Sequence, residues 1–550
     1  MKQIIQILCS LAVIFLVSCS GKQDQNKEPD QQITSEGLVA HIKTLASDEF
    51  LGRKPFTRGE ELTINYIREQ FQLAGLSPAT GDTYFQDVPL VEINASDSPS
   101  LSVTLESGKI EFSFRDDFVL LTRRVVDNIL LENSEMIFAG YGVIAPEYNW
   151  NDYDGLDVKG KTVVVLVNDP GFFGDNDTFF KGKAMTYYGR WTYKYEEAAR
   201  QGAAAILIIH DTEPASYPWG VVESGWTGAN LYLRSENNNL DRCMLEGWIT
   251  NEKAKELFTQ AGYEDYDFYY EARKGEFNAF SLNASLSASL SNSISTSTSY
   301  NVAGLIPGTE RPEEVIVYSS HWDHMGTNRP VQGDSIWNGA IDNASGIATI
   351  IEIAKAMNSG DVKPKRSVLF LAVTAEEQGL LGSEYYSTHP IFPPNKTVAN
   401  INIDALHANG PMKDVTIVGY GQSELDEVAG AAAKKQGRYV LPDPNPGKGS
   451  FFRSDHFNFG KVGIPALYAK GGYEHSEKGI EYAEQMSKDY ESNRYHKPAD
   501  EYNENWDMRG MVEDARLFYQ IGIDLSNSSN WPKWKEGSEF KAIREQSMNE

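Results

Sequence analysis

The chain has 550 residues, enough for two or three domains that each bury a core of their own. Its hydrophobic fraction of 41% and charged fraction of 23% exclude a disordered chain. The formal net charge of −27 excludes a nucleic-acid partner, because such a partner needs an excess of cations to neutralise its phosphates.

The first residues have the composition of an export signal. Lys2 precedes the apolar stretch 4–17, which is too short to cross a bilayer comfortably, and polar residues follow Cys19. This arrangement resembles a bacterial lipoprotein signal, in which residues 1–18 are removed and Cys19 becomes the acylated first residue. We therefore expect an exported bacterial lipoprotein, periplasmic or on the cell surface, anchored to the membrane through Cys19. The alternative is a plain signal peptide with an incidental cysteine.

Several segments before residue 300 can be interpreted from their periodicity. Residues 19–34 are polar and aperiodic, which predicts a flexible tether. Apolar residues at spacings of three and four predict helices at 38–45 and 62–73. Between 281 and 299 apolar residues alternate with Ser and Asn, and this period of two predicts a strand with one wet face rather than a linker.

The segment between the two predicted helices and residue 280 has a different pattern of apolar residues. Buried-type strands are predicted at 161–167 and 202–209, with a helix at 195–201 before the second of them. The Gly- and Trp-rich stretch 219–226 predicts an exposed loop. We interpret this part as a smaller, β-rich domain inserted in the chain at 131–279.

From about residue 300 onward, strands and helices alternate. Strands are predicted at 315–320, 367–373, 398–403 and 464–468, and a helix at 344–357. Such alternation predicts an α/β fold with a doubly wound, mostly parallel sheet and helices on both faces. We assign residues 35–130 and 280–550 to this domain, which the insert splits.

Side chains that can bind a metal lie at the carboxyl ends of the predicted strands, at a loop-to-helix junction and far downstream. Because the carboxyl ends of strands in an open α/β sheet face one crevice, these side chains can converge. Singly each is more often incidental, and their joint placement at successive strand ends indicates a site. The candidates are His321, Asp323, Asp342, Glu376, Glu377, Asp404 and His496. Of the other histidines, candidates for the crevice wall are His324, His456 and His475, and structural or solvated roles are expected for His41, His210, His389 and His407.

The types of these side chains select the metal. Two imidazoles and several carboxylates without a thiolate suit zinc or a related divalent ion. The number of carboxylates is larger than one tetrahedral zinc ion uses. One of them can bridge two ions about 3.5–4 Å apart. Of the adjacent pair Glu376 and Glu377, one can face the metal while its neighbour takes a proton from the attacking water.

These motifs resemble metallopeptidase family twenty-eight, which includes bacterial aminopeptidases, glutamate carboxypeptidase and glutaminyl cyclase. The motifs occur in the family's order, and the resemblance covers most of residues 35–130 and 300–526. The matching text lies at Leu45–Arg53, Ser320–Gly326, Gly333–Gly346, Ala375–Ser383, Asn402–Asp404, Ser454–Phe457, Gly463–Ala466 and Tyr495–His496.

The resemblance implies a zinc-exopeptidase domain with two zinc ions per chain. One zinc would be held by His321, Asp342 and Asp404. The other would be held by Asp342, Glu377 and His496, so that Asp342 bridges the two.

The resemblance also implies catalytic roles. Glu376 would be the general base and later the proton donor, and Tyr495 would donate to the developing oxyanion. Asp323 would orient His321 from behind the metal. A cis peptide bond is implied between Asp342 and Asn343, and no substrate-binding residue is implied.

The insert resembles a protease-associated domain, through residues 154–163 and 194–209. Such a domain would roof part of the crevice and restrict the size of the substrate. The alternative is a spacer or docking module without influence on catalysis.

We expect a co-catalytic di-zinc exopeptidase with peptide substrates, first of all an aminopeptidase that releases N-terminal residues. A carboxypeptidase acting on acidic C-termini would want a cation in the crevice, such as Arg453. A glutaminyl cyclase is disfavoured by Asn343, where cyclases have Ser. A non-catalytic binding protein resembling the transferrin receptor, which has lost metal ligands, is disfavoured by the complete ligand set.

Overall fold

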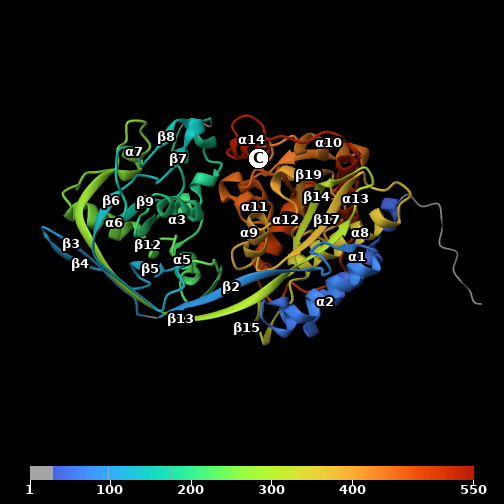
Figure 1. Ribbon diagram of the computed structural model, residues 1–550, viewed down its shortest axis with the longest axis horizontal. Helices are drawn as coiled ribbons and strands as arrows, with labels where there is room; N and C mark the ends of the chain where they lie inside the picture. Colours follow the sequence, from blue (N-terminus) through green and yellow to red (C-terminus); the bar gives the residue numbers. More distant parts are fainter. Residues whose placement is uncertain (1–28, 97, 175, 177, 550) are drawn as a thin grey trace, which may run out of the picture.

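The computed structural model describes residues 29–96, 98–174, 176 and 178–549. The predicted signal and the lipidation site at Cys19 lie outside the described residues. Figure 1 shows two lobes, with strand β13 (Phe280–Ile306) arching from one to the other and β2 (Phe85–Ala95) beside it. Within the described residues, no helix has the length and apolar character needed to cross a bilayer.

The larger lobe is built on one mixed sheet. In spatial order its strands are β11 (Ala229–Leu233), β2, β13, β17 (Arg366–Val373), β14 (Arg311–His321), β18 (Thr397–Asn402), β21 (Ala466–Lys470), β19 (Asp414–Val418) and β20 (Tyr439–Pro442), and β1 (Ser77–Pro78) pairs with the end of β13. The four central strands β17, β14, β18 and β21 are parallel to one another. Antiparallel strands flank them, β13 on one side and β19 on the other. The predicted α/β fold with a parallel central sheet is confirmed.

Helices cover both faces of this sheet. One face carries α1 (Ser35–Leu45), α2 (Arg58–Leu73), α8 (Ser345–Ser359), α10 (Leu425–Lys435) and α13 (Arg509–Asn527), and the other carries α9 (Leu381–Thr388) and α11 (His456–Lys461). Successive residues of β17 point alternately to these two layers: Phe370 packs into the first core and Leu369 and Leu371 into the second. Near the C-terminus follow α12 (Gly479–Asn493) and α14 (Lys541–Ser547).

The smaller lobe has a second sheet, which shares β13. Its strands are, in spatial order, β4 (Gly108–Glu111), β3 (Ser100–Leu105), β13, β6 (Asn128–Phe138), β9 (Thr162–Leu166), β10 (Ala205–His210), β12 (Leu245–Thr250) and β5 (Phe118–Leu121). Its helices are α3 (Trp191–Arg200), α4 (Thr212–Ala215), α5 (Trp219–Gly225), α6 (Asn251–Gln260) and α7 (Phe268–Ala272). Two short hairpins complete the fold, β7 (Ile144–Ala145) with β8 (Trp150–Asn151), and β15 (Gly326–Val331) with β16 (Asp334–Trp337).

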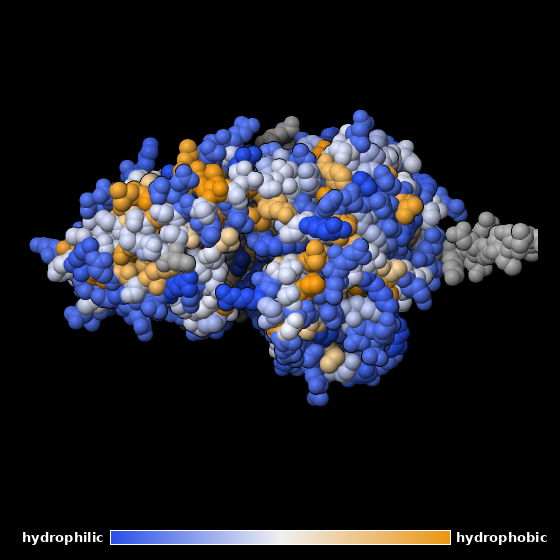
Figure 2. All heavy atoms as spheres, turned by 90° about the horizontal axis from the view of Figure 1, so that it is seen from below, coloured by the Kyte–Doolittle hydropathy of each residue, from blue (hydrophilic) through white to orange (hydrophobic). Residues whose placement is uncertain are grey.

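The division between the lobes depends on strand pairing. Strands β3, β4 and β5 lie before residue 131 and belong to the sheet of the smaller lobe, whereas β11 lies inside 131–279 and pairs with β2 in the larger one. The boundaries at 131 and 279 stay a proposal, and the pairing favours an earlier start for the insert. Figure 2 shows a groove between the two lobes that is bordered mainly by hydrophilic residues.

Two sequence interpretations of this region have different outcomes. The strand predicted at 281–299 is confirmed within β13, whose Leu and Ala side chains are buried while many of its Ser and Thr side chains are exposed. The loop predicted at 219–226 is wrong, because Trp219–Gly225 forms α5. The helix forms because Val222 is buried and Trp226, directly after it, packs against Trp191 and Trp248, so tertiary contacts outweigh the glycines.

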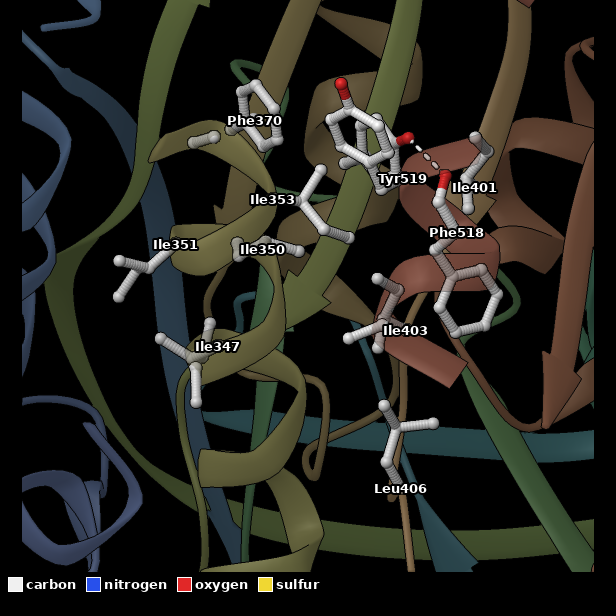
Figure 3. Packing of buried hydrophobic residues seen from close by; sticks show 14 of the residues in the cluster. Ile347, Ile350, Ile351, Ile353, Phe370, Ile401, Ile403, Leu406, Phe518 and Tyr519 are labelled. Carbon is white, nitrogen blue, oxygen red and sulfur yellow. Dashed lines mark hydrogen bonds between the residues drawn. The ribbon is translucent and has the colours of Figure 1, made fainter. Parts of the chain in front are cut away.

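The core of the larger lobe lies between the sheet and α8. Figure 3 shows Phe370 from β17 and Ile350 and Ile353 from α8 in this core. The Phe370 ring is fully buried and stacks on Tyr318 with the ring centroids 5.2 Å apart. A buried aromatic side chain of this kind removes a large apolar area from water.

Replacing Phe370 by Ala is therefore expected to lower the free energy of unfolding by about 3–5 kcal/mol, because a cavity replaces the ring. Leu73→Ala is the matched control, since the Leu73 side chain is 78% exposed and its loss should change stability by less than about 0.5 kcal/mol. Denaturant unfolding of both variants measures the difference. Equal stabilities would contradict this assignment of the core.

Candidate metal centre

The carboxyl ends of β14, β17 and β18 face a cavity of about 590 Å³ in the larger lobe. His321 is the last residue of β14, Glu376 follows β17, and Asp404 follows β18. All three line the cavity, together with Asp342 and His496. His321, Glu376 and Asp404 therefore meet at one edge of the sheet, since their strands are parallel neighbours. Asp342, just before α8, and His496, after α12, reach the same cavity from outside the strands.

A first group of donors is centred on His321. The Nε2 atom of His321 lies 3.1 Å from Asp342 Oδ1 and 3.3 Å from Asp404 Oδ1. All three residues are buried, and their ligand atoms lie close enough to hold one metal ion. The other oxygen of Asp404, Oδ2, accepts a hydrogen bond of 2.6 Å from the hydroxyl of Ser454.

A second group lies on the other side of Asp342. His496 Nε2 is 3.3 Å from Asp342 Oδ2 and 3.0 Å from Glu377 Oε2. Asp342 thus presents one oxygen to each group, the arrangement that a bridging carboxylate needs. His324 also lies here, with its Nδ1 2.6 Å from Glu377 Oε1, and the ligand atoms of His324, Asp342 and Glu377 lie close enough together to hold one metal ion.

The distances within the two groups fit zinc. Zinc binds His nitrogen and carboxylate oxygen at about 2.0–2.2 Å, so neighbouring ligands of a tetrahedral ion lie about 3.3 Å apart. The contacts of His321 with Asp342 and Asp404, and of His496 with Asp342 and Glu377, range from 3.0 to 3.3 Å. The donor types and the spacing therefore suit two zinc positions that share Asp342.

The electrostatics of the site also favour cations. Burial raises the pKa of Glu376 well above its usual range, and the carboxylates of Glu377 and Asp404 add to this against the effect of His321. Burial disfavours the charged form of His321, yet Glu376, Asp342 and Asp404 outweigh it and raise the pKa of this imidazole well above its usual range. Several carboxylates crowded into a buried site repel one another, and divalent cations relieve that repulsion.

Asp323 positions this site through two different atoms. Its main-chain carbonyl accepts a hydrogen bond of 3.1 Å from His321 Nδ1. Its carboxylate accepts the backbone N–H groups of Glu376, at 3.0 Å, and of Glu377, at 3.3 Å, and lies 3.8 Å from His321 Nδ1. The carboxylate expected to orient His321 thus fixes the backbone of the two glutamates, and the carbonyl of Asp323 holds the imidazole.

The backbone segment that carries Asp342 is fixed by hydrogen bonds to Asp500. The carboxylate of Asp500 accepts the N–H groups of Ile341, at 3.1 Å, and of Asp342, at 3.0 Å. Burial raises the pKa of Asp500 to about 6, against the effect of these hydrogen bonds. The peptide bond between Asp342 and Asn343 is cis, as the resemblance implies.

A buried arginine supports the same loops. Arg53 donates to the carbonyl oxygens of Trp322, at 2.8 Å, of Asn338, at 2.5 Å, and of Gly339, at 2.8 Å. Burial lowers the pKa of Arg53 to about 10, and the nearby carboxylate of Asp500 partly offsets this. The positive charge of Arg53 thus lies near the carboxylates of the site. Its N–H groups fix the loop after β14 and the loop before Asp342.

Sequence reasoning did not assign roles to Asp500, Ser454 or Arg53, although Arg53 and Ser454 lie in the matching motifs and Asp500 follows His496 by four residues. Each is a polar residue in or near a motif, which could have marked it as a candidate. Its role was missed because the atoms that it binds lie far away in the sequence. His407, expected to be structural or solvated, lines the cavity. Of the histidines expected at the crevice wall, His324 lies beside Glu377, and the cavity-lining residues do not include His456 or His475, both of which are buried.

The family of this region can now be stated. Residues 301–519 match the model of the family described as "Peptidase family M28". The chain carries a domain of peptidase family M28. This M28 domain contains each of the predicted ligands and Glu376, Asp323 and Tyr495.

Known proteins resemble the chain in sequence over limited parts of its length. Aminopeptidase NAALADL1 of Mus musculus is 33% identical over 111 residues, which are 19% of this chain and 13% of the mouse protein. The glutamate carboxypeptidase 2 homolog of Caenorhabditis briggsae is 30% identical over 187 residues, 31% of this chain and 21% of that protein. The match therefore spans less than a quarter of either relative. The solved structure of an aminopeptidase from Aneurinibacillus sp. strain AM-1 is 17% identical, with a TM-score of 0.49 over 92% of this chain and 97% of its own.

Proposed function

We propose that this chain is a zinc-dependent aminopeptidase, with two zinc ions bridged by Asp342. The observation that carries the proposal is the position of Glu376. It lines the same cavity as His321, Asp342 and Asp404, and its Oε2 lies 4.0 Å from His321 Nε2. A carboxylate is thus placed beside the first donor group, outside the sets of side chains that fit a metal.

The roles of the ligands follow from the distances. His321, Asp342 and Asp404 would hold one zinc, and Asp342, Glu377 and His496 the other. When bound, zinc polarises a carbonyl oxygen and makes nearby water a stronger acid.

Glu376 moves the proton in the proposed reaction. As the water attacks the scissile carbonyl, a carboxylate oxygen of Glu376 takes its proton, and the same group later delivers that proton to the leaving nitrogen. The N–H of Glu376 is fixed by Asp323, so its side chain starts from a defined position.

Tyr495 is the proposed donor to the developing oxyanion. It lines the cavity, and its ring stacks on His496 with centroids 3.9 Å apart. Desolvation inside the cavity, and after it the carboxylates of Asp342 and Glu377, raise the pKa of Tyr495, so the phenol keeps the proton that it has to donate. The residue as a whole is 44% exposed, which leaves it accessible to a substrate.

Tyr495→Phe is expected to lower kcat by about 10²-fold, because the stacking ring remains and only the donor is lost. Tyr473→Phe is the matched control, since Tyr473 lines the same cavity and has no proposed role. Steady-state kinetics of both variants on one substrate test this role. A kcat of Tyr495→Phe equal to that of the wild type would contradict it.

The proposed protease-associated insert lies next to the site without lining it. Among the described residues, those around the larger cavity all come from positions 321 to 496. A neighbouring cavity of about 380 Å³ shares Val418 and Asp443 with it and is lined in part by Lys181 and Met185 of the insert. Tyr187 of the insert packs against Phe452 and Phe457 of the larger lobe. These contacts support a roof beside the catalytic cavity, which would favour chain ends over internal peptide bonds.

A carboxypeptidase is the second candidate, and one observation favours it. The side chains of Lys448, Arg453 and Lys470 line the cavity and offer cations to a C-terminal carboxylate. The cavity also contains Asp443 and Glu491, which suit the free amine of an aminopeptidase substrate.

Hydrolysis of a substrate panel separates these functions. The panel contains aminoacyl-nitroanilides, their N-acetylated forms, and peptides with free or amidated C-termini, each tested with and without a chelator. Chelator-sensitive cleavage limited to free amino termini is expected for an aminopeptidase. Cleavage that needs a free C-terminus would replace it with the carboxypeptidase, and no cleavage by the zinc-loaded protein would overturn both.

We also propose that the mature protein is exported and anchored to the bacterial membrane through a lipid on Cys19, as the N-terminal sequence indicates. Metabolic labelling with a radioactive fatty acid tests this. Label in the wild type and its loss in Cys19→Ser support the anchor, and equal labelling of both contradicts it.

A further inference from the structure

His324 lies against the second group of donors, where its imidazole is close enough to Asp342 and Glu377 to be a metal ligand or a hydrogen-bond partner of one. It follows His321 by three residues, directly after the end of β14. Its side chain is fully buried, and its Nδ1 lies 2.6 Å from Glu377 Oε1. Its ring meets that of His496 edge-on, with the centroids 5.8 Å apart.

The distance between His324 Nδ1 and Glu377 Oε1 shows whether the two side chains form a hydrogen bond or bind the same metal ion. Two atoms that bind one tetrahedral zinc lie about 3.3 Å apart, and His496 Nε2 lies 3.0 Å from Glu377 Oε2. The 2.6 Å between His324 Nδ1 and Glu377 Oε1 is shorter than this and matches a charge-assisted hydrogen bond. His324 is therefore placed to donate to Glu377 rather than to share its metal.

The ring of His324 has no other polar partner. Its Nε2 is buried and makes no hydrogen bond within the described part of the chain. Gly339 packs so closely that a Cβ atom there would lie 2.6 Å from the imidazole, so the ring is held in place. A neutral imidazole with its proton on Nδ1 meets Glu377 and leaves Nε2 as an unpaired acceptor, which costs less than an unpaired buried donor.

The first group contains a counterpart to this contact. Asp404 turns Oδ1 towards His321 Nε2, and its Oδ2 accepts the hydroxyl of Ser454 at 2.6 Å. Glu377 likewise turns Oε2 towards His496 Nε2, while its Oε1 meets His324 at 2.6 Å. In both groups one carboxylate oxygen is tied to a neutral donor and the other is left for the metal.

We propose that His324 is a positioning residue for the second zinc position: its Nδ1–H holds Glu377 Oε1, so that Oε2 is presented beside His496 as a single ligand atom. The inference rests on the proposed zinc centre and deepens it. Hydrogen-bond partners of metal ligands fix ligand orientation, and their loss weakens metal affinity by about 10–100-fold. His324 should therefore control the affinity of one zinc position and leave the other unchanged.

Zinc affinities of the full chain, measured by competition with a chromogenic chelator, test this inference. His324→Ala and the bulkier His324→Phe both remove the donor, whereas His324→Asn places an amide N–H near the position of Nδ1. We expect the Ala and Phe variants to bind one of two zinc ions about 10–100-fold more weakly, and the Asn variant to keep most of the affinity. Ser454→Ala is the matched control, because it removes the corresponding donor from Asp404 and should weaken the other zinc ion.

Each contrary result has a distinct meaning. Unchanged affinity in the Ala and Phe variants would overturn the inference. Equal losses in the Ala, Phe and Asn variants would also overturn it, because they would make His324 a metal ligand. A wild-type protein that binds no zinc would overturn the proposed function and this inference with it, whereas zinc binding without peptidase activity would leave the inference standing. Melting curves by circular dichroism identify a variant that is not folded, and the remaining variants then decide the outcome.

Discussion

Replacing Glu376 by Gln is expected to lower kcat by about 10⁴-fold while both zinc ions stay bound. General acid–base catalysis contributes about 10²–10⁴-fold to a reaction, and Glu376 is the proposed proton carrier in both halves of this one. Its carboxylate belongs to neither of the two donor groups, so the amide should not displace a metal. Gln keeps the shape of the side chain and the N–H that Asp323 holds, so the change isolates the loss of the base.

Two measurements on one preparation decide this prediction. Metal analysis gives the zinc content, and steady-state kinetics on a nitroanilide substrate give kcat. Glu481→Gln is the matched control, because Glu481 lies exposed on α12 and has no proposed role. A zinc-loaded Glu376→Gln variant with wild-type kcat would remove Glu376 from the mechanism. A variant that loses its zinc would instead make Glu376 a ligand.

Replacing Asp342 by Asn is expected to weaken both zinc positions together and to abolish measurable turnover. Asp342 Oδ1 lies 3.1 Å from His321 Nε2, and Oδ2 lies 3.3 Å from His496 Nε2, so one carboxylate serves both groups. An amide offers one neutral oxygen and one N–H, and it can no longer bridge two cations. Because the loss of an outer partner already weakens metal binding by about 10–100-fold, the loss of a shared ligand should weaken it by more than about 100-fold.

Zinc content after dialysis against a weak chelator measures this effect. Asp361→Asn serves as the control, since Asp361 is exposed and lies outside the M28 site. The account predicts two zinc ions in the control and fewer than one in Asp342→Asn. Loss of one zinc ion alone would show that Asp342 does not bridge.

The fold of the larger lobe could be predicted because its strands are long, apolar and separated by clear helical periodicity. The strands predicted around 315–320 and 367–373 occur as β14 and β17, and the helix predicted at 344–357 occurs as α8. The convergence of His321 and Asp404 was predictable from the rule that parallel strands end at one edge. The 3.3 Å between His321 and Asp404 is the outcome of that rule.

The supporting contacts could not be predicted from the sequence. Asp500 acts on backbone N–H groups about 160 residues earlier in the chain, and no periodicity encodes such a contact. The role of Asp323 was expected through its carboxylate, but the main-chain carbonyl holds His321, and only the turn geometry reveals this. Trp226 shows the same limit in the insert, because its aromatic neighbours stabilise a helix that its local composition disfavours.

The pairing of the strands in the smaller lobe could not be predicted from the sequence either. Strand β5 joins β12 although about 125 residues separate them, and β3 pairs with β13 across about 180 residues. Strand order in a sheet depends on contacts over the whole chain, whereas periodicity reports only on the local face.

The most direct test of the account is a zinc titration of chelator-treated protein, followed by metal analysis and by the hydrolysis rate of an aminoacyl-nitroanilide. The account predicts that activity returns only as zinc binds, that binding saturates at two ions per chain, and that Asp342→Asn regains neither. Activity that survives the chelator, or a zinc-saturated protein that cleaves no substrate with a free amino terminus, would contradict the proposal of a di-zinc aminopeptidase.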